Sequence, residues 1–200
     1  MYSQNDEEKW IEGYFANKIE EKKVGRFLDI GAYDGKTFSN THRLFELGWF
    51  GVCVEPSPSV FVGLLKLYGR EERIQLVNAA VGPNAQLMQF HDSGGDAVST
   101  LSKSHRDKWD SGSNFKSFFV PVVTVYNILT QVGFAFDFIN IDIEGTNLEL
   151  LKTFPPPTLR SASMVCIEHD GHAEEMLEIL QSVAEFKELH RNGENLIVVK

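Results

Sequence analysis

The sequence is poor in cysteine and has no long apolar run, and these absences exclude several classes of protein. Its only cysteines, Cys53 and Cys166, lie inside apolar runs typical of central strands, which favours buried thiols over a disulfide or a metal site. No apolar stretch approaches the roughly 18–20 residues that span a bilayer, and the first residues are acidic, unlike a targeting peptide. We therefore expect a soluble, cytoplasmic protein with no membrane partner.

Positive charge is also scarce. The 19 Lys and Arg residues face 28 Asp and Glu residues, which gives a formal net charge of −9. A nonspecific nucleic-acid binder needs a basic face, so we expect no nucleic-acid partner. One basic stretch, from Lys103 to Lys116, could touch an acidic substrate or form a solvated loop of mixed charge.

The length of 200 residues and the 42% share of hydrophobic side chains match one globular domain, residues 1–200. Strand-like runs rich in Val, Ile and Phe are continuous rather than alternating, as in parallel strands buried on both faces. They occur near residues 26–31, 50–55, 74–81, 136–143 and 162–168.

Helical patterns separate these runs. Residues 1–24 should contain an amphipathic helix with one face of apolar side chains, Trp10, Ile11, Tyr14, Phe15 and Ile19. Further helices are predicted over 37–47, with Phe38, Leu44 and Phe45 pointing inward, over 57–69, and over 174–184. In the 57–69 helix, Ser57 suits the N-cap, Val60, Phe61, Leu64 and Leu65 form an apolar stripe, and Gly69 suits a left-handed C-terminal end.

The C-terminus reads as a hairpin around Asn192-Gly193-Glu194. Alternating strands and helices followed by such a hairpin predict an α/β, Rossmann-like sheet of the class I methyltransferase type. It would have seven mostly parallel strands, helices on both faces and an antiparallel C-terminal hairpin. The wide gap between the third and fourth runs indicates an inserted segment, 83–118, rich in Gly and Ser, which we interpret as a lid or substrate-recognition element.

The first motif, residues 29–35 with Asp29, Gly31, Ala32 and Gly35, lies where a strand should end. Glycine at 31 lets the backbone turn tightly and approach a ligand. A dinucleotide fingerprint would have glycine at position 33, where this chain has Tyr33. The pattern favours a nucleoside with an amino-acid tail over NAD or FAD, with a purely structural turn as the alternative.

The second and third runs end in further candidate residues. Glu55, followed by Pro56 and Ser57, can accept hydrogen bonds from both ribose hydroxyls, or be an exposed strand-end glutamate. After the third run, Asn78, Ala79 and Ala80 leave room for an adenine ring, although small residues there can serve packing alone.

Two carboxylates follow the fourth run and project to the same side of an extended chain, Asp142 and Glu144. Asp142 could hold the ammonium group of a methionine tail, and Glu144 could reach an acceptor. His169, after the fifth run, is a candidate general base or a hydrogen-bonding support. Together with Asp170 these side chains could hold Mg²⁺, but we expect no metal and assign no metal ligand.

These motifs, with Ser99-Thr100-Leu101 and Cys166 to Asp170, resemble the FkbM family of methyltransferases over about residues 26–199. The resemblance implies a class I fold, S-adenosylmethionine as methyl donor, and O-methylation of a sugar or another hydroxylated small molecule. It matches Asp29, Gly31 and Gly35 to the first motif, Glu55 to the ribose-binding acid, and Asp142 with Glu144 to the fourth-strand motif. Asn147 departs from the acidic or other polar residue that many members carry at that position.

The sequence therefore predicts an S-adenosylmethionine-dependent methyltransferase. A noncatalytic binding module with the same fold and a nicotinamide-dependent oxidoreductase are the alternatives. The sequence does not fix the oligomeric state. The predicted catalytic residues are Glu144 and His169, and the predicted cofactor-binding residues are Asp29, Gly31, Ala32, Gly35, Glu55, Pro56, Ser57, Asn78, Ala79, Ala80 and Asp142.

Overall fold

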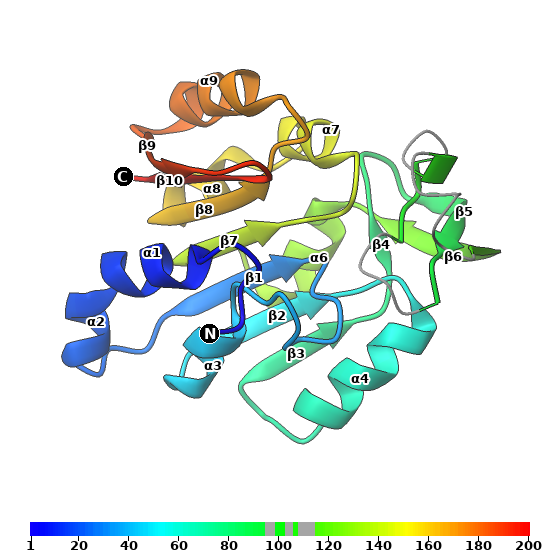
Figure 1. The fold of residues 1–200 in the computed structure, drawn as a ribbon, viewed down its shortest axis with the longest axis horizontal. Helices are drawn as coiled ribbons and strands as arrows, with labels where there is room; N and C mark the ends of the chain where they lie inside the picture. The colour runs from blue at the N-terminus through cyan, green and yellow to red at the C-terminus, as the bar shows by residue number, and fades with distance from the viewer. Residues whose placement is uncertain (95–98, 103–105, 108–114) are drawn as a thin grey trace.

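A seven-stranded sheet in the order β3-β2-β1-β7-β8-β10-β9 forms the centre of the molecule (Figure 1). The computed structural model describes residues 1–94, 99–102, 106–107 and 115–200. The strands are β1 (Arg26–Ile30), β2 (Phe50–Val54), β3 (Ile74–Val77), β7 (Phe138–Ile141), β8 (Met164–Glu168), β9 (Lys187–Arg191) and β10 (Asn195–Val199). β10 pairs antiparallel with β8 and β9, while the other pairs are parallel. This confirms the predicted sheet and its C-terminal hairpin.

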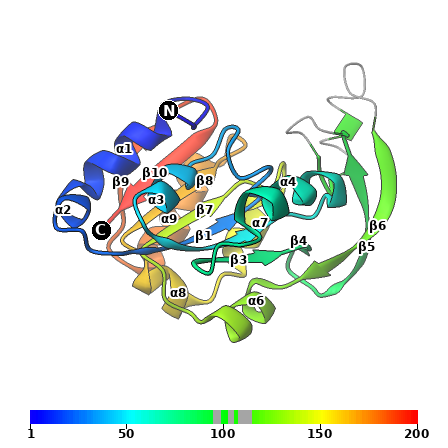
Figure 2. The same cartoon turned by 90° about the horizontal axis from the view of Figure 1, so that it is seen from below.

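Helices cover both faces of the sheet, because successive side chains of each strand point to opposite sides. On one face pack α6 (Val125–Val132), α7 (Asn147–Lys152), α8 (Pro156–Ser161) and α9 (Ala173–Val183). The other face carries α1 (Glu7–Tyr14), α2 (Ala16–Glu20), α3 (His42–Glu46) and α4 (Pro58–Tyr68). Figure 2 shows the two layers with the sheet between them.

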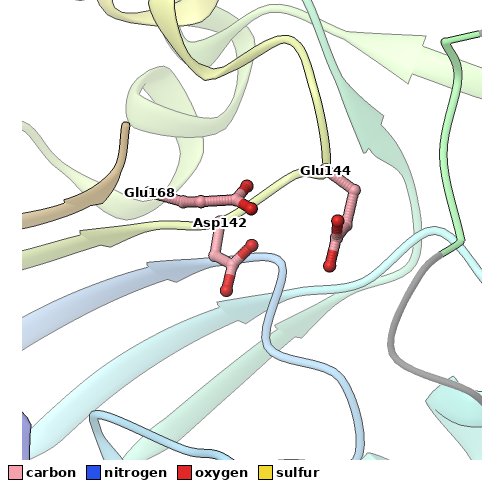
Figure 3. Close-up of side chains that lie close together, drawn as sticks. All are labelled: Asp142, Glu144 and Glu168. Atoms are coloured by element: carbon pink, nitrogen blue, oxygen red, sulfur yellow. The ribbon is translucent and has the colours of Figure 1, made fainter. Parts of the chain in front are cut away.

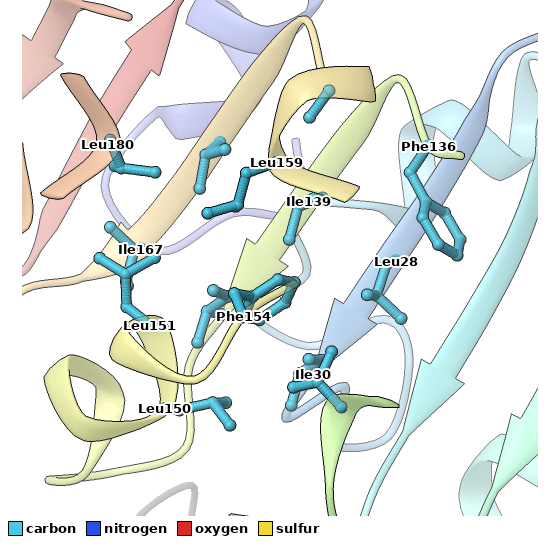
Figure 4. Packing of buried hydrophobic residues seen from close by; sticks show 14 of the residues in the cluster. Leu28, Ile30, Phe136, Ile139, Leu150, Leu151, Phe154, Leu159, Ile167 and Leu180 are labelled. Atoms are coloured by element: carbon cyan, nitrogen blue, oxygen red, sulfur yellow. The ribbon is translucent and has the colours of Figure 1, made fainter. Parts of the chain in front are cut away.

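The larger apolar cluster lies between the sheet and the helices α6 to α9 (Figure 4). Leu28 and Ile30 from β1, Ile139 from β7 and Ile167 from β8 are all fully buried in it. The helices and their connections add Leu150, Leu151, Phe154, Leu159 and Leu180. Because apolar side chains are buried on both faces, the central strands read as continuous rather than alternating apolar runs.

A second, three-stranded sheet in the order β4-β6-β5 stands beyond the carboxyl ends of β1, β2 and β7 (Figures 1 and 2). It consists of β4 (Ala80–Val81), β5 (Gln86–Asp92) and β6 (Lys116–Val123). The sequence predicted one strand over 74–81. That was wrong, since the chain leaves the main sheet after Val77 and β4 pairs with β6 instead.

The structure therefore builds the 83–118 segment around the antiparallel pair β5–β6. Part of the predicted basic stretch, including Lys103, His105 and Lys108, lies outside the described residues, as do Gly95, Ser104 and Ser111 to Ser113. The described Arg106 forms an ion pair with the neighbouring Asp107. The hypothesis of contact with an acidic substrate stays a prediction.

The helix predicted over 37–47 is shorter than expected. Only His42–Glu46 is helical, and Phe38 has a φ of +55°, which a helix does not allow. The Asp34 carboxylate accepts hydrogen bonds from the backbone N–H groups of Lys36 and Thr37 at 2.8 and 2.7 Å. This local turn competes with the helix, and it leaves Phe38 half exposed rather than pointing into the core.

Three other details of the helices differ from the predictions. Gly69 follows α4 with a φ of −63°, so the expected left-handed end is wrong, although Ser57 caps the helix as predicted. Leu65 is exposed on α4, outside the buried stripe. Trp10 is also exposed and stacks on His190, with ring centroids 4.5 Å apart, so this residue covers β9 rather than entering the core.

Both cysteines are free and buried, as predicted. None of the described helices has the length and apolar character that crossing a bilayer requires.

Gly51 offers a test of the packing between β1 and β2. A Cβ at position 51 would lie 2.1 Å from Cζ of the fully buried Phe27. Gly51→Ala should therefore lower the free energy of unfolding by about 1–3 kcal/mol, the usual cost of overpacking. Gly13→Ala is the control, since a Cβ there meets nothing within 4 Å. Urea denaturation that gave equal stabilities for both variants would contradict this packing.

Candidate functional site

An open pocket lies at the carboxyl ends of β1, β2 and β7, next to the three-stranded sheet. Ligands of open α/β sheets bind at this edge. The pocket brings together most of the predicted site residues, which come from distant parts of the sequence: Asp29, Gly31, Ala32, Glu55, Pro56, Ala79, Ala80, Asp142 and Glu144.

Gly31 forms the closest contact in the floor of the pocket. A Cβ at this position would lie 1.6 Å from the backbone oxygen of Asp142, and the φ of Gly31 is +90°. Both facts exclude any residue with a side chain unless the backbone moves. The glycine therefore allows the ends of β1 and β7 to meet.

Glu55 is buried at the end of β2 and is held by the backbone. Its Oε2 accepts a hydrogen bond from the Tyr33 N–H at 3.0 Å, and its Oε1 accepts one from the Ser57 N–H at 2.8 Å. Burial raises the pKa of Glu55 to about 8, although these two hydrogen bonds oppose the shift. Each carboxylate oxygen keeps a further lone pair that can accept a hydrogen bond from a ligand hydroxyl.

Three predicted cofactor residues do not line the pocket but support those that do. Gly35 packs beneath α4, where a Cβ would lie 2.7 Å from Leu64 and Tyr68. Ser57 caps α4 and donates a backbone hydrogen bond to Glu55. Asn78 is exposed, and its Nδ2 donates to the Glu55 backbone oxygen at 2.8 Å. These contacts favour supporting roles over direct contact with a cofactor.

Asp29 is a buried carboxylate without a cationic partner among its hydrogen bonds. Its Oδ2 accepts from the Thr41 hydroxyl at 2.6 Å, and its Oδ1 accepts from Asn140 Nδ2 at 2.9 Å. Burial raises the pKa of Asp29, and both hydrogen bonds favour its charged form. These bonds connect the end of β1 to Thr41 and to β7, and the predicted contact of Asp29 with the cofactor stays a prediction.

Three carboxylates, Asp142, Glu144 and Glu168, lie close together (Figure 3), and the first two line the pocket. One oxygen from each of Asp142, Glu144 and Glu168 lies within 4.8 Å of the others. Burial is the largest cause that raises the pKa values of Asp142 and Glu168, and repulsion among these carboxylates adds to it. Such a group favours a cationic ligand, either an ammonium group or a divalent metal ion.

Asn147, which departs from the family pattern, connects Glu168 of this cluster to Asp170 and to the loop that carries Asp142 and Glu144. It is fully buried, and its Nδ2 donates to Glu168 Oε2 at 2.6 Å and to Asp170 Oδ2 at 3.0 Å. Its Oδ1 accepts from the Ile143 N–H at 2.9 Å, which fixes the loop between Asp142 and Glu144. An amide provides both a donor and an acceptor here, which a carboxylate at position 147 would not.

His169 does not line the pocket. Its Nδ1 accepts a hydrogen bond from the Gly171 N–H at 3.0 Å, and its Nε2 lies 3.1 Å from the Asn192 backbone oxygen. With both ring nitrogens bonded to the backbone, His169 stabilises the turn after β8. This placement does not support the hypothesis that His169 is the general base.

Sequence reasoning missed Gln4 and assigned no individual pocket residue to the inserted segment. Gln4, from the N-terminal segment, lines the pocket, and the neighbouring Ser3 forms a β-bridge with Phe38. Ser99 and Leu101 line it from the inserted segment, and the Thr100 hydroxyl between them donates to the Glu144 backbone oxygen at 2.6 Å. Both the interpretation of 83–118 as a lid or substrate-recognition element and the family resemblance of Ser99-Thr100-Leu101 pointed to this part of the pocket.

The fold and this pocket define a class I methyltransferase: strands in the order described, a glycine turn after β1, an acid after β2 and an acidic loop after β7. The sequence matches the family model described as Methyltransferase FkbM domain over residues 29–191. The chain belongs to the FkbM methyltransferase family, which implies S-adenosylmethionine as the methyl donor. No curated protein matches the sequence.

Solved structures agree with this fold. The methyltransferase FkbM from Methylobacillus flagellatus KT has a TM-score of 0.56 and 15% identity, and the match covers 88% of this chain and 44% of that one. A hypothetical protein of Thermus thermophilus has a TM-score of 0.53 and 14% identity, covering 99% and 86%. A SAM-dependent methyltransferase from Agrobacterium tumefaciens has a TM-score of 0.51 and 12% identity, covering 96% and 61%. This chain thus spans less than half the length of the Methylobacillus protein.

The raised pKa of Glu55 predicts a specific pH dependence of stability. Folding raises the pKa of this carboxyl group from 4.5 to about 8. Between these two pH values the group therefore lowers the free energy of unfolding more and more as the pH rises. Glu55→Gln removes this ionisation, so its free energy of unfolding relative to the wild type should increase by roughly 1–4 kcal/mol between pH 5 and pH 9.

The Gln side chain can accept only one of the two backbone hydrogen bonds, and this loss lowers the stability equally at both pH values. The change between pH 5 and pH 9 therefore isolates the effect of ionisation. Glu178→Gln, on the exposed side of α9, is the control and should show no such change. Urea denaturation of ligand-free protein measures both. A constant difference between Glu55→Gln and the wild type would show that Glu55 is ionised at both pH values.

Proposed function

We propose that this chain transfers a methyl group from S-adenosylmethionine to a hydroxyl oxygen of a sugar or another small molecule. The observation that carries the proposal is the pocket itself. It contains the Glu55 carboxylate, which two backbone N–H groups hold, together with the glycine turn at Gly31 and the acidic cluster at Asp142. This combination suits a ligand with a ribose at one end and a cationic group at the other.

Each of these residues would contact a different part of the methyl donor. Glu55 would accept hydrogen bonds from the ribose hydroxyls, with Pro56 beside it, while Ala79 and Ala80 leave space for the adenine ring. Gly31 and Ala32 let the ligand approach the end of β1 closely. Burial and acidic neighbours both raise the pKa of Asp142. A cation favours the charged form of the carboxylate, so Asp142 would bind the ammonium group of the methionine tail.

The bound donor supplies a methyl group that is already activated on a sulfonium sulfur. The protein then has to align the acceptor and to remove its proton, and alignment alone can contribute on the order of 7–11 kcal/mol. Glu144 lines the pocket with a φ of +55°, and Thr100 holds its backbone oxygen. We assign Glu144 as the group that takes the hydroxyl proton.

The charge of the pocket favours a neutral acceptor. Its described lining contains four carboxylates, Asp29, Glu55, Asp142 and Glu144, and neither Lys nor Arg. A phosphate or carboxylate on the acceptor would find no cationic side chain to pair with in this lining. A sugar hydroxyl carries no such charge. The Ser99 and Leu101 wall would contact the acceptor, since it faces Glu144 from the inserted segment.

Thermal unfolding with S-adenosylhomocysteine, the reaction product, tests the donor site. At about 100 times its dissociation constant the ligand should stabilise the protein by about 2.7 kcal/mol, which corresponds to a rise of about 5–11 °C in Tm for a chain of this size. Glu55→Gln and Asp142→Ala should lose most of this rise. Glu178→Gln, far from the pocket, should keep it.

Two outcomes would contradict the proposal. A rise in Tm with NADH and none with S-adenosylhomocysteine would indicate a nicotinamide-dependent enzyme. Binding of S-adenosylhomocysteine with no methyl transfer to any of a broad panel of sugars and phenols would favour a noncatalytic binding module.

A further inference from the structure

Asn40 has a buried acceptor atom that the protein leaves unused. The residue lines the pocket and is only 8% exposed. Its Nδ2 donates to Asn140 Oδ1 at 3.0 Å and lies 3.7 Å from the Cys166 sulfur. Its Oδ1 is buried and has no hydrogen-bond partner among the residues that the structure describes.

The neighbouring hydrogen bonds fix the orientation of this amide. Asp29 can only accept when ionised, so Asn140 must turn its Nδ2 towards Asp29 and its Oδ1 away. Asn40 therefore presents its own Nδ2 to Asn140 Oδ1. Exchanging the nitrogen and oxygen of Asn40 would bring two carbonyl oxygens together, so the unused atom is the oxygen.

A buried acceptor without a donor is destabilising, and such atoms in native proteins commonly bind a water molecule or a ligand. We infer that Asn40 Oδ1 accepts a hydrogen bond from the ammonium group of the donor's methionine tail and helps Asp142 to position it. The inference rests on the proposed function, because it assumes that S-adenosylmethionine occupies the pocket.

The position of Asn40, in the connection between β1 and α3, selects the ammonium group over the other donors of the ligand. Asn40 is tied to β7 and β8 through Asn140 and Cys166. Glu55 and Ala79, where the ribose and adenine are proposed to lie, follow β2 and β3 on the other side of β1. Asp142 follows Asn140 by two positions and so projects to the same side of β7.

Ligands that differ in the tail separate this role from a structural one. Isothermal titration calorimetry would compare S-adenosylhomocysteine with 5′-methylthioadenosine, which lacks the amino-acid tail, on the wild type and on Asn40→Leu. A hydrogen bond to a charged group is strong, so Asn40→Leu should weaken binding of S-adenosylhomocysteine by about 10-fold or more. Binding of 5′-methylthioadenosine should change by less than about 2-fold.

A third ligand separates the ammonium group from the carboxylate of the tail. For S-adenosylhomocysteine in which hydrogen replaces the amino group, Asn40→Leu and the wild type should agree within about 2-fold. Asn40→Ser, which is too short to reach the same point, repeats the measurement if the leucine variant does not fold.

Equal losses for S-adenosylhomocysteine and 5′-methylthioadenosine, or no loss for either, would overturn the role of Asn40 while leaving the donor site intact. Failure of the wild type to bind S-adenosylhomocysteine would instead overturn the proposed function, and the role of Asn40 with it.

Discussion

The contact between the ends of β1 and β7 is the constraint on which the site depends. The Asp142 N–H donates to the Ile30 backbone oxygen at 2.9 Å, and the Asp142 backbone oxygen fills the space where a side chain of residue 31 would begin. This close approach places the acidic loop after β7 directly over the glycine turn. Glu144 and Gly145 then take φ values of +55° and +91°, which direct the chain away from the sheet. Backbone strain of this kind persists only where the surroundings hold it, and here the Thr100 hydroxyl and the Asn147 amide do so.

A second feature is the way in which the protein stabilises its buried acids. Glu7, Asp29, Glu55 and Glu168 are partnered by amides, hydroxyls and backbone N–H groups in their hydrogen bonds. Neutral donors stabilise a carboxylate without cancelling its charge. Asp29 and Glu55, which line the pocket, are therefore held by neutral donors, with no lysine or arginine among these hydrogen bonds. Asn147 is a neutral donor of the same kind, because its amide donates to both Glu168 and Asp170.

The sequence predicted the sheet, the glycine turn, Glu55 and the acidic loop because each depends on short-range patterns. A buried parallel strand is continuously apolar, and the residue that ends it lies at the edge where ligands bind. What it could not predict depends on tertiary contacts. The break after Val77 follows from pairing of β4 with β6, some 40 residues later, a separation beyond any local pattern. His169 looked suitable because its residue type titrates near neutrality, but its direction is set by Gly171 and Asn192. Asn40 gave no local signal, since it lies in a segment that the pattern assigned to a helix.

The pairing of β1 with β7 also determines when during folding this pocket can exist. Asp29 and Asn140 are 111 positions apart, and the hydrogen bond between them joins two strands at the centre of the sheet. Contacts between residues so distant in sequence close a large loop and form slowly. A growing chain that has released only β1 to β6 from the ribosome holds Gly31 and Glu55 but lacks Asn140, Asp142 and Glu144, which complete the lining. Capture of a ligand therefore has to wait for the second half of the sheet, which makes the pocket a late product of folding.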